Sequence, residues 1–132
     1  MEIKEAEKAA IVNRGDLYRL KTCIRRAAAG KKLRIGFFGG SITQGSLASS
    51  DKTCYAWLVY QWWIKTFPQT EFEYINGGIG GTSSLYGVSR VEKDILAYKP
   101  EFVIIDFSVN DEPTEFFKET YEGLLRKLLG FS

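Results

Sequence analysis

Short strand-like runs alternate with longer segments of helical periodicity along the chain. Residues 33–38, 71–76 and 101–107 are bounded by turn residues and predict three β-strands. The third run is continuously apolar at 102–105, which indicates a strand covered on both faces of a parallel sheet. Since helical segments separate the three runs, the pattern predicts an α/β fold with a doubly wound parallel sheet.

The first helix before this sheet is predicted from its capping residues and its apolar spacing. Asp16 is a typical N-cap residue, and Gly30 is a typical C-terminal stop. Between them, one helical face carries Leu17, Leu20 and Ile24. We therefore expect residues 1–30 to form an N-terminal helical segment.

A second helix is predicted at residues 53–67, and Pro68 ends it. This segment is apolar almost all round, as expected for a helix packed between a sheet and its neighbours. Its aromatic residues could form a platform for sugars or lipids, but their density favours a place in the core. They are Tyr55, Trp57, Tyr60, Trp62 and Trp63.

Two further helices are predicted after the second and third strands. One stops before Pro100, and the other starts near Pro113. Their apolar positions at helical spacing are Val88, Val91, Ile95 and Leu96 in the first, and Phe117, Leu124, Leu125 and Leu128 in the second.

Composition and charge narrow the class of protein. The 132 residues suffice for one domain, and 45% of them are hydrophobic. The net charge of +2 is spread without basic blocks, so we expect neither nucleic acid nor a membrane as partner. Cys23 and Cys54 have no metal-ligand spacing and read as buried free thiols in a reducing compartment. We therefore expect a cytoplasmic location and no bound metal or organic cofactor.

Small and polar residues follow each predicted strand, at 40–41, 76–84 and 108–111. In a parallel sheet the carboxyl ends of the strands lie along one edge, so these three loops should converge. Together they hold a serine, a glycine-rich turn and an asparagine. These are the parts of an acyl-transfer site, with a nucleophile, backbone N–H donors and a side-chain amide.

Two other interpretations of the glycines compete with an acyl-transfer site, namely nucleotide binding and tight turns without chemistry. Gly40 and Gly45 have the spacing of a phosphate-binding loop, but Ser46 stands where that loop needs lysine. The pair Gly78 and Gly80 begins a dinucleotide fingerprint that Ser83 interrupts. Alternatively, the glycines only permit tight turns.

The three loops resemble the first three sequence blocks of the SGNH (GDSL) hydrolases, a family of lipases and acylhydrolases. The matching segments are "GGSIT" at 39–43, "NGGIGGTSS" at 76–84 and "FSVND" at 107–111, with Ser108 in place of the usual glycine. The resemblance implies a flavodoxin-like three-layer α/β/α sandwich that hydrolyses carboxylic esters. Acetylated carbohydrates, lysophospholipids and short aryl esters are all open as substrates.

The same resemblance implies roles for particular residues. Ser41 would be the nucleophile, and the oxyanion hole would combine the N–H groups of Ser41 and Gly81 with the Asn110 amide. Gly80 is the alternative to Gly81, because the glycine cluster leaves the alignment loose by one residue. Asp111 is expected to fix the turn after Asn110, and Asp106 to be a hydrogen-bonded structural group.

The chain departs from the family pattern at its C-terminal side. It contains no histidine, so the Asp-x-x-His block that supplies the base is missing, and three strands are predicted where the family has five. We therefore expect residues 1–132 to be an incomplete SGNH-like domain, through truncation, proteolysis or a split gene, and to be weakly active or inactive alone. The alternative is a degenerate homologue that serves as a non-catalytic binding or assembly module.

The missing strands also bear on assembly. In the family's strand order the run at 101–107 would be flanked by a fourth strand, and here it would form an edge. Because it is apolar and has no proline, that edge favours pairing with another chain. We expect a homo-oligomer, with two copies joined at this strand.

Overall fold

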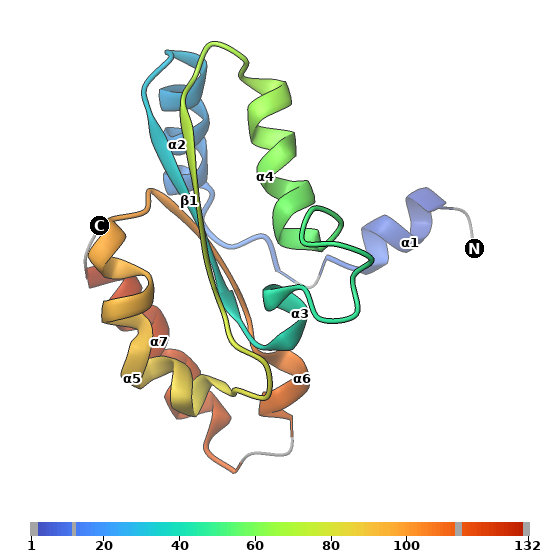
Figure 1. Ribbon diagram of the computed structural model, residues 1–132, viewed down its shortest axis with the longest axis vertical. Helices are drawn as coiled ribbons and strands as arrows, with labels where there is room; N and C mark the ends of the chain where they lie inside the picture. The colour runs from blue at the N-terminus through green and yellow to red at the C-terminus, as the bar shows by residue number, and fades with distance from the viewer. Residues whose placement is uncertain (1–2, 12, 113–114, 131–132) are drawn as a thin grey trace.

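The computed structural model of the protein, which describes residues 3–11, 13–112 and 115–130, is built on a three-stranded parallel sheet (Figure 1). Its elements in chain order are α1 (Ile3–Ala9), α2 (Tyr18–Ala28), β1 (Leu33–Gly39), α3 (Ser41–Gln44), α4 (Tyr55–Thr66), β2 (Phe72–Gly78), α5 (Ser84–Asp94), the 3-10 helix η1 (Leu96–Tyr98), β3 (Phe102–Asp106), α6 (Ser108–Asp111) and α7 (Phe117–Gly130). The strand order is β2-β1-β3, with β1 in the centre. The predicted α/β class is confirmed.

The register of the sheet brings the carboxyl ends of its strands together. Gly39, the last residue of β1, pairs with Gly78 of β2 on one side and with Asp106 of β3 on the other. Every residue of β1 except Arg34 is buried, as expected of a central strand. The loops that follow the strands therefore begin side by side, as the sequence predicts.

One face of the sheet is covered by α2 and α4, whose buried residues form one apolar cluster with those of β1. Alternate residues of β1 point to this face, in keeping with the two-residue period of a strand. The buried residues of this cluster are Cys23, Ala27, Leu33, Ile35, Phe37, Cys54, Ala56, Tyr60 and Trp63. We call it the aromatic face.

The opposite face is covered by α5 and α7, which pack against each other (Figure 1). Its buried apolar residues are Phe38, Ile75, Val91, Ile95, Leu96, Phe107, Leu124. The buried charged residues Arg90 and Asp111 also belong to this side of the molecule, and we call it the charged face. Two helical layers with a sheet between them make the expected α/β/α sandwich.

The helix boundaries differ from the predictions by a few residues. Helix α2 begins at Tyr18 after Leu17, although the Asp16 carboxylate still accepts the Tyr18 N–H at 2.8 Å. Helix α4 is shorter at both ends than the predicted 53–67. Helix α5 ends at Asp94, because Ile95 leaves the helical conformation (φ −128°, ψ −60°) before η1.

The last helix shows the largest departure. Helix α7 starts at Phe117, and the expected start at Pro113 lies outside the described residues. Leu124 is fully buried, whereas Phe117 and Leu125 are 37% and 40% exposed. The apolar positions at helical spacing therefore divide between a buried and an exposed side of this helix.

Three further features concern the cysteines, the N-terminal helix and the length of the helices. Cys23 and Cys54 are buried free thiols, as predicted. Helix α1 lies apart from the sheet in Figure 1, and the side chains described for it are exposed. Among the described residues, no helix combines the length and apolar character needed to cross a bilayer.

Candidate active site

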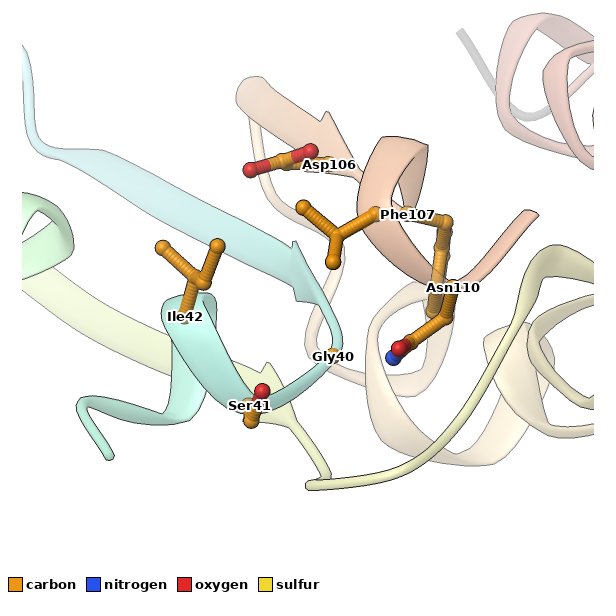
Figure 2. Close-up of a pocket in the computed structure, with 7 residues that line it drawn as sticks. Gly40, Ser41, Ile42, Asp106, Phe107 and Asn110 are labelled. Carbon is orange, nitrogen blue, oxygen red and sulfur yellow. The ribbon is translucent and has the colours of Figure 1, made fainter. Parts of the chain in front are cut away.

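Ser41 lies at the point where β1 ends and the single-turn helix α3 begins (Figure 2). Its side chain is half-buried, and its hydroxyl has no hydrogen-bond partner within the described part of the chain. Gly40 before it must be small, because a Cβ atom there would lie 2.6 Å from Asn110 Nδ2 and 3.2 Å from the Thr82 carbonyl oxygen. The turn therefore presents the Ser41 hydroxyl against the neighbouring loops.

Asn110 reaches this turn from α6. Its backbone N–H donates to the Phe107 carbonyl at 3.0 Å, and its Nδ2 donates to the Thr82 carbonyl at 2.8 Å. Figure 2 shows its amide pointing toward the Gly40–Ser41 turn. An amide group carries two N–H donors, so one can hold Thr82 while the other faces the space beside Ser41.

The glycine turn after β2 distinguishes Gly80 from Gly81. The Gly80 N–H donates to Gln44 Oε1 at 2.7 Å. The Gly81 N–H has no acceptor within the described residues, and its φ of +72° lies in the left-handed region that glycine tolerates. Of the two N–H groups, the one at Gly81 is therefore available to a ligand.

A small depression brings the first and third loops together. It is lined by Gly40, Ser41, Ile42, Asp106, Phe107, Val109 and Asn110 (Figure 2). Ile42 and Val109 are 48% and 66% exposed, so apolar side chains flank the polar groups of Ser41 and Asn110. A hydroxyl, an amide donor and a short apolar wall suit a small acyl group.

Comparison with solved structures identifies proteins similar to this chain. A two-domain esterase, CEX, described as active on acetylated mannans, shares 64% identity with a TM-score of 0.86, over 88% of this chain and 31% of its own. The acetyl xylan esterase AlAXEase shares 29% identity with a TM-score of 0.59, over 75% of this chain and 54% of its own. AlinE4, an SGNH-hydrolase family esterase at 21% identity, shows the same fold with a TM-score of 0.63, over 76% of this chain and 55% of its own.

These similarities agree with the three sequence blocks. The chain has the fold of the SGNH (GDSL) hydrolases, and the solved structures similar to it are esterases. No family sequence model matches the chain. No curated protein sequence matches it either. The chain spans 31% of the length of CEX.

The two aspartates at the end of β3 and in the third SGNH block, Asp106 and Asp111, make structural hydrogen bonds. Asp111 is 3% exposed, and its Oδ1 accepts the Ser84 N–H at 2.7 Å at the start of α5. Asp106 Oδ1 accepts the N–H and the hydroxyl of Ser108, at 3.2 and 2.8 Å. In Figure 2 the Asp106 carboxylate points away from Ser41. Asp106 is the hydrogen-bonded structural group that was predicted, whereas the Asp111 carboxylate bonds to the start of α5 and not to its own turn. Ser108, at the family's glycine position, donates its N–H and its hydroxyl to Asp106 at the end of β3.

Thr43 anchors the short helix that carries Ser41. Its side chain is fully buried, and its hydroxyl is 2.9 Å from the hydroxyl of Tyr55 on α4. Its carbonyl accepts Asn76 Nδ2 at 2.9 Å. Burial raises the pKa of Tyr55, and the hydrogen bond to Thr43 opposes that rise. Helix α3 is therefore held from both α4 and β2.

Arg90 on α5 is the residue at this site that the sequence did not reveal. It is 7% exposed, and its guanidinium donates to the carbonyls of Gly77 (2.6 Å) and Gly39 (3.1 Å). It also pairs with Asp94 at 2.9 Å. An Arg–Asp pair at i, i+4 on an amphipathic helix is typical of an exposed face, so the sequence pattern pointed away from burial.

The described residues contain no cluster of three or more His, Cys, Asp or Glu side chains arranged to hold a metal ion.

Proposed function

We propose that this protein hydrolyses carboxylic esters through an acyl-Ser41 intermediate. One observation carries the proposal: the Ser41 hydroxyl, the available Gly81 N–H and the Asn110 amide are set on the loops that the register brings to one edge of the sheet. Similarity to SGNH-type esterases supports the same assignment. Gly81, rather than Gly80, is proposed as the second backbone donor because Gln44 occupies the Gly80 N–H.

The reaction has two balanced steps. Ser41 Oγ attacks the ester carbonyl carbon while a base takes the hydroxyl proton, and the carbonyl oxygen becomes an oxyanion held by the Ser41 and Gly81 N–H groups and Asn110 Nδ2. The intermediate collapses, the C–O bond to the alcohol breaks, and the leaving oxygen receives that proton. Water then attacks the acyl-serine in the same way, which releases the carboxylic acid and restores the Ser41 hydroxyl.

The base is proposed to be an imidazole from outside these 132 residues. The chain contains no histidine, and the two nearby carboxylates are engaged in structural hydrogen bonds. Without a base, a serine hydrolase retains only about 10³–10⁴-fold acceleration over water. We therefore expect the isolated chain to hydrolyse esters poorly.

The proposed substrates are acetyl esters of polysaccharides such as mannan. CEX is described as active on acetylated mannans and has been crystallised with mannopentaose, and AlAXEase is described as an acetyl xylan esterase. The small depression beside Ser41, with Ile42 and Val109 at its margin, is consistent with a short acyl group. The 64% identity to CEX favours mannan over xylan.

Imidazole added to the buffer can replace the missing base, so it tests Ser41 as the nucleophile in the 132-residue chain. We expect p-nitrophenyl acetate hydrolysis by the wild-type chain to rise with imidazole concentration above the rate of Ser41→Ala at the same concentration. Subtracting the Ser41→Ala rate removes the hydrolysis that imidazole itself causes. Equal rates for both proteins at every imidazole concentration would contradict the proposal and favour the non-catalytic binding or assembly module, which the missing histidine otherwise supports.

We also propose that the 132-residue chain forms a homodimer through β3. This strand pairs with β1 on one side only, and all of its residues are half-buried rather than buried. An apolar, unpaired strand edge favours pairing with another copy. Sedimentation in the micromolar range should give a species larger than 15.0 kDa, and a stable monomer would contradict this proposal.

A further inference from the structure

The buried guanidinium of Arg90 contacts both glycine-rich turns of the site. Its Nη2 donates to the Gly39 carbonyl at 3.1 Å, directly before the turn that carries Ser41. Its Nη1 donates to the Gly77 carbonyl at 2.6 Å, at the start of the turn that carries Gly81. One rigid group therefore bridges the ends of β1 and β2.

Further bonds extend this bridge to the third loop. Nη2 of Arg90 lies 3.4 Å from the hydroxyl oxygen of Thr82, whose carbonyl accepts the Asn110 amide at 2.8 Å. The Gly39 carbonyl also accepts the Ile79 N–H at 3.0 Å. Each of the three loops of the site is thus connected to Arg90 directly or through a single residue.

Arg90 is itself held in place from several sides. Its guanidinium lies 4.3 Å from the centre of the Phe38 ring, and Asp94 balances its charge at 2.9 Å. The helix that carries it is tied at its first residue, Ser84, to the Asp111 carboxylate. A planar group with several fixed donors suits this role better than lysine, whose ammonium is a single flexible point charge.

We propose that Arg90 is a positioning residue of the acyl-transfer site. It fixes the Ser41 turn relative to the Gly81 turn, so that the oxyanion donors face the carbonyl that Ser41 attacks. The inference rests on the proposed esterase function. It concerns the geometry of the two turns, so it is also measurable without turnover.

The test compares Arg90→Lys with Arg126→Lys. Arg126 is a matched control because it also pairs with an acid four residues away on its own helix, Glu122 at 2.7 Å, but its side chain is 77% exposed. In the imidazole assay we expect Arg90→Lys to lower the Ser41-dependent kcat by about 10- to 100-fold, with KM changed less than about two-fold. Amide resonances of Ser41 and Gly81 should shift in Arg90→Lys and stay unchanged in Arg126→Lys.

Two results would overturn the inference. One is a folded Arg90→Lys protein with the wild-type kcat and unshifted Ser41 and Gly81 amides. The second result applies if Arg90→Lys does not fold, and it is measured on the wild-type chain. We expect the guanidinium protons of wild-type Arg90 to be protected from exchange and to show couplings to the Gly39 and Gly77 carbonyls. A lack of both protection and couplings would overturn the inference. A wild-type chain without any Ser41-dependent rate would refute the proposed function alone, and the amide shifts would then decide the role of Arg90.

Discussion

The two faces of the sheet are built from different chemistry. The aromatic face is neutral, and its rings contact one another in tilted pairs, with ring centroids 5.4 Å apart for Trp63 and Phe102 and 5.0 Å apart for Tyr60 and Tyr74. The charged face encloses Arg90 and Asp111 among apolar residues such as Leu124. Arg90 on the charged face bonds to the ends of β1 and β2, whereas the aromatic face reaches the site through the hydrogen bond between Tyr55 and Thr43.

This difference separates stability from the positioning of the site. Burying a neutral aromatic ring stabilises the fold through the area it removes from water. Burying a charge has a desolvation cost that its partners only partly offset, so a buried ion is weak evidence for stability. Asp111 and Arg90 are therefore better explained by the loops they hold, and substitutions on the two faces should have different consequences.

The largest effect is expected from Trp63→Ala on the aromatic face. Removing this ring, which is 2% exposed, should lower the free energy of unfolding by about 3–5 kcal/mol because it leaves a cavity. Denaturant titration measures the change, and Trp62→Ala, at 51% exposed, is the matched control with an expected loss within about 0.5 kcal/mol. Shifted Ser41 and Gly81 amides in folded Trp63→Ala would show that the aromatic face also positions the site.

Asn110→Ala should lower activity strongly and stability only slightly, the opposite of Trp63→Ala. Loss of an oxyanion donor lowers kcat by about 10²–10³, whereas the lost hydrogen bond to Thr82 lowers stability by only about 1 kcal/mol. The imidazole assay and denaturant titration measure the two effects. Asn13→Ala, in an exposed loop, is the control. An unchanged kcat in folded Asn110→Ala would remove Asn110 from the proposed oxyanion hole.

Asp111→Ala should affect stability and activity together. The Ser84 N–H would lose its buried acceptor, at an expected cost of about 1–3 kcal/mol. Since Asn110 precedes Asp111 on the same short helix, kcat should fall as well. Asp111→Asn, which keeps an acceptor oxygen, should recover part of both. A loss of stability with unchanged kcat would show that the charged face can be weakened without moving the site.

Alkaline pH should produce the smallest change, and mainly on the aromatic face. Burial raises the pKa of Tyr55, Tyr60 and Tyr74 there, and of Tyr121 on the other face, above the ordinary value of 10.0. Their contribution to stability is complete below pH 10.0 and is lost as the pH rises through the higher folded values. The free energy of unfolding should therefore be level below that pH and fall above it.

Tyr60→Phe tests that assignment. This variant keeps the ring and loses the hydrogen bond to the Phe72 carbonyl at 2.9 Å, together with one of the raised groups. We expect a shallower decline of stability above pH 10.0 in a denaturant series across pH. An unaltered slope would mean that Tyr60 does not contribute to the alkaline transition.

Much of the fold and of the candidate site could be predicted from local patterns. The strands at 33–38, 71–76 and 101–107 agree with β1, β2 and β3 to within a few residues, because the period of apolar positions is a property of neighbouring residues. The place of Ser41 at the carboxyl end of the first strand followed from the same pattern and from the topology of parallel sheets.

Other features depended on residues distant in the sequence. The choice between Gly80 and Gly81 required the Gln44 side chain, which comes from α3. The exposure of Leu125 depended on what packs beside α7, which helical spacing does not specify.

Arg90 shows most clearly the limit of the sequence by itself. Its spacing from Asp94 is typical of an i, i+4 ion pair on a helix surface, and the two side chains do pair at 2.9 Å. Its burial was decided only when the ends of β1 and β2 placed the carbonyls of Gly39 and Gly77 within reach of one guanidinium. Apolar periodicity is local and can be read along the chain, whereas a buried charge is stable only where the tertiary structure supplies its acceptors.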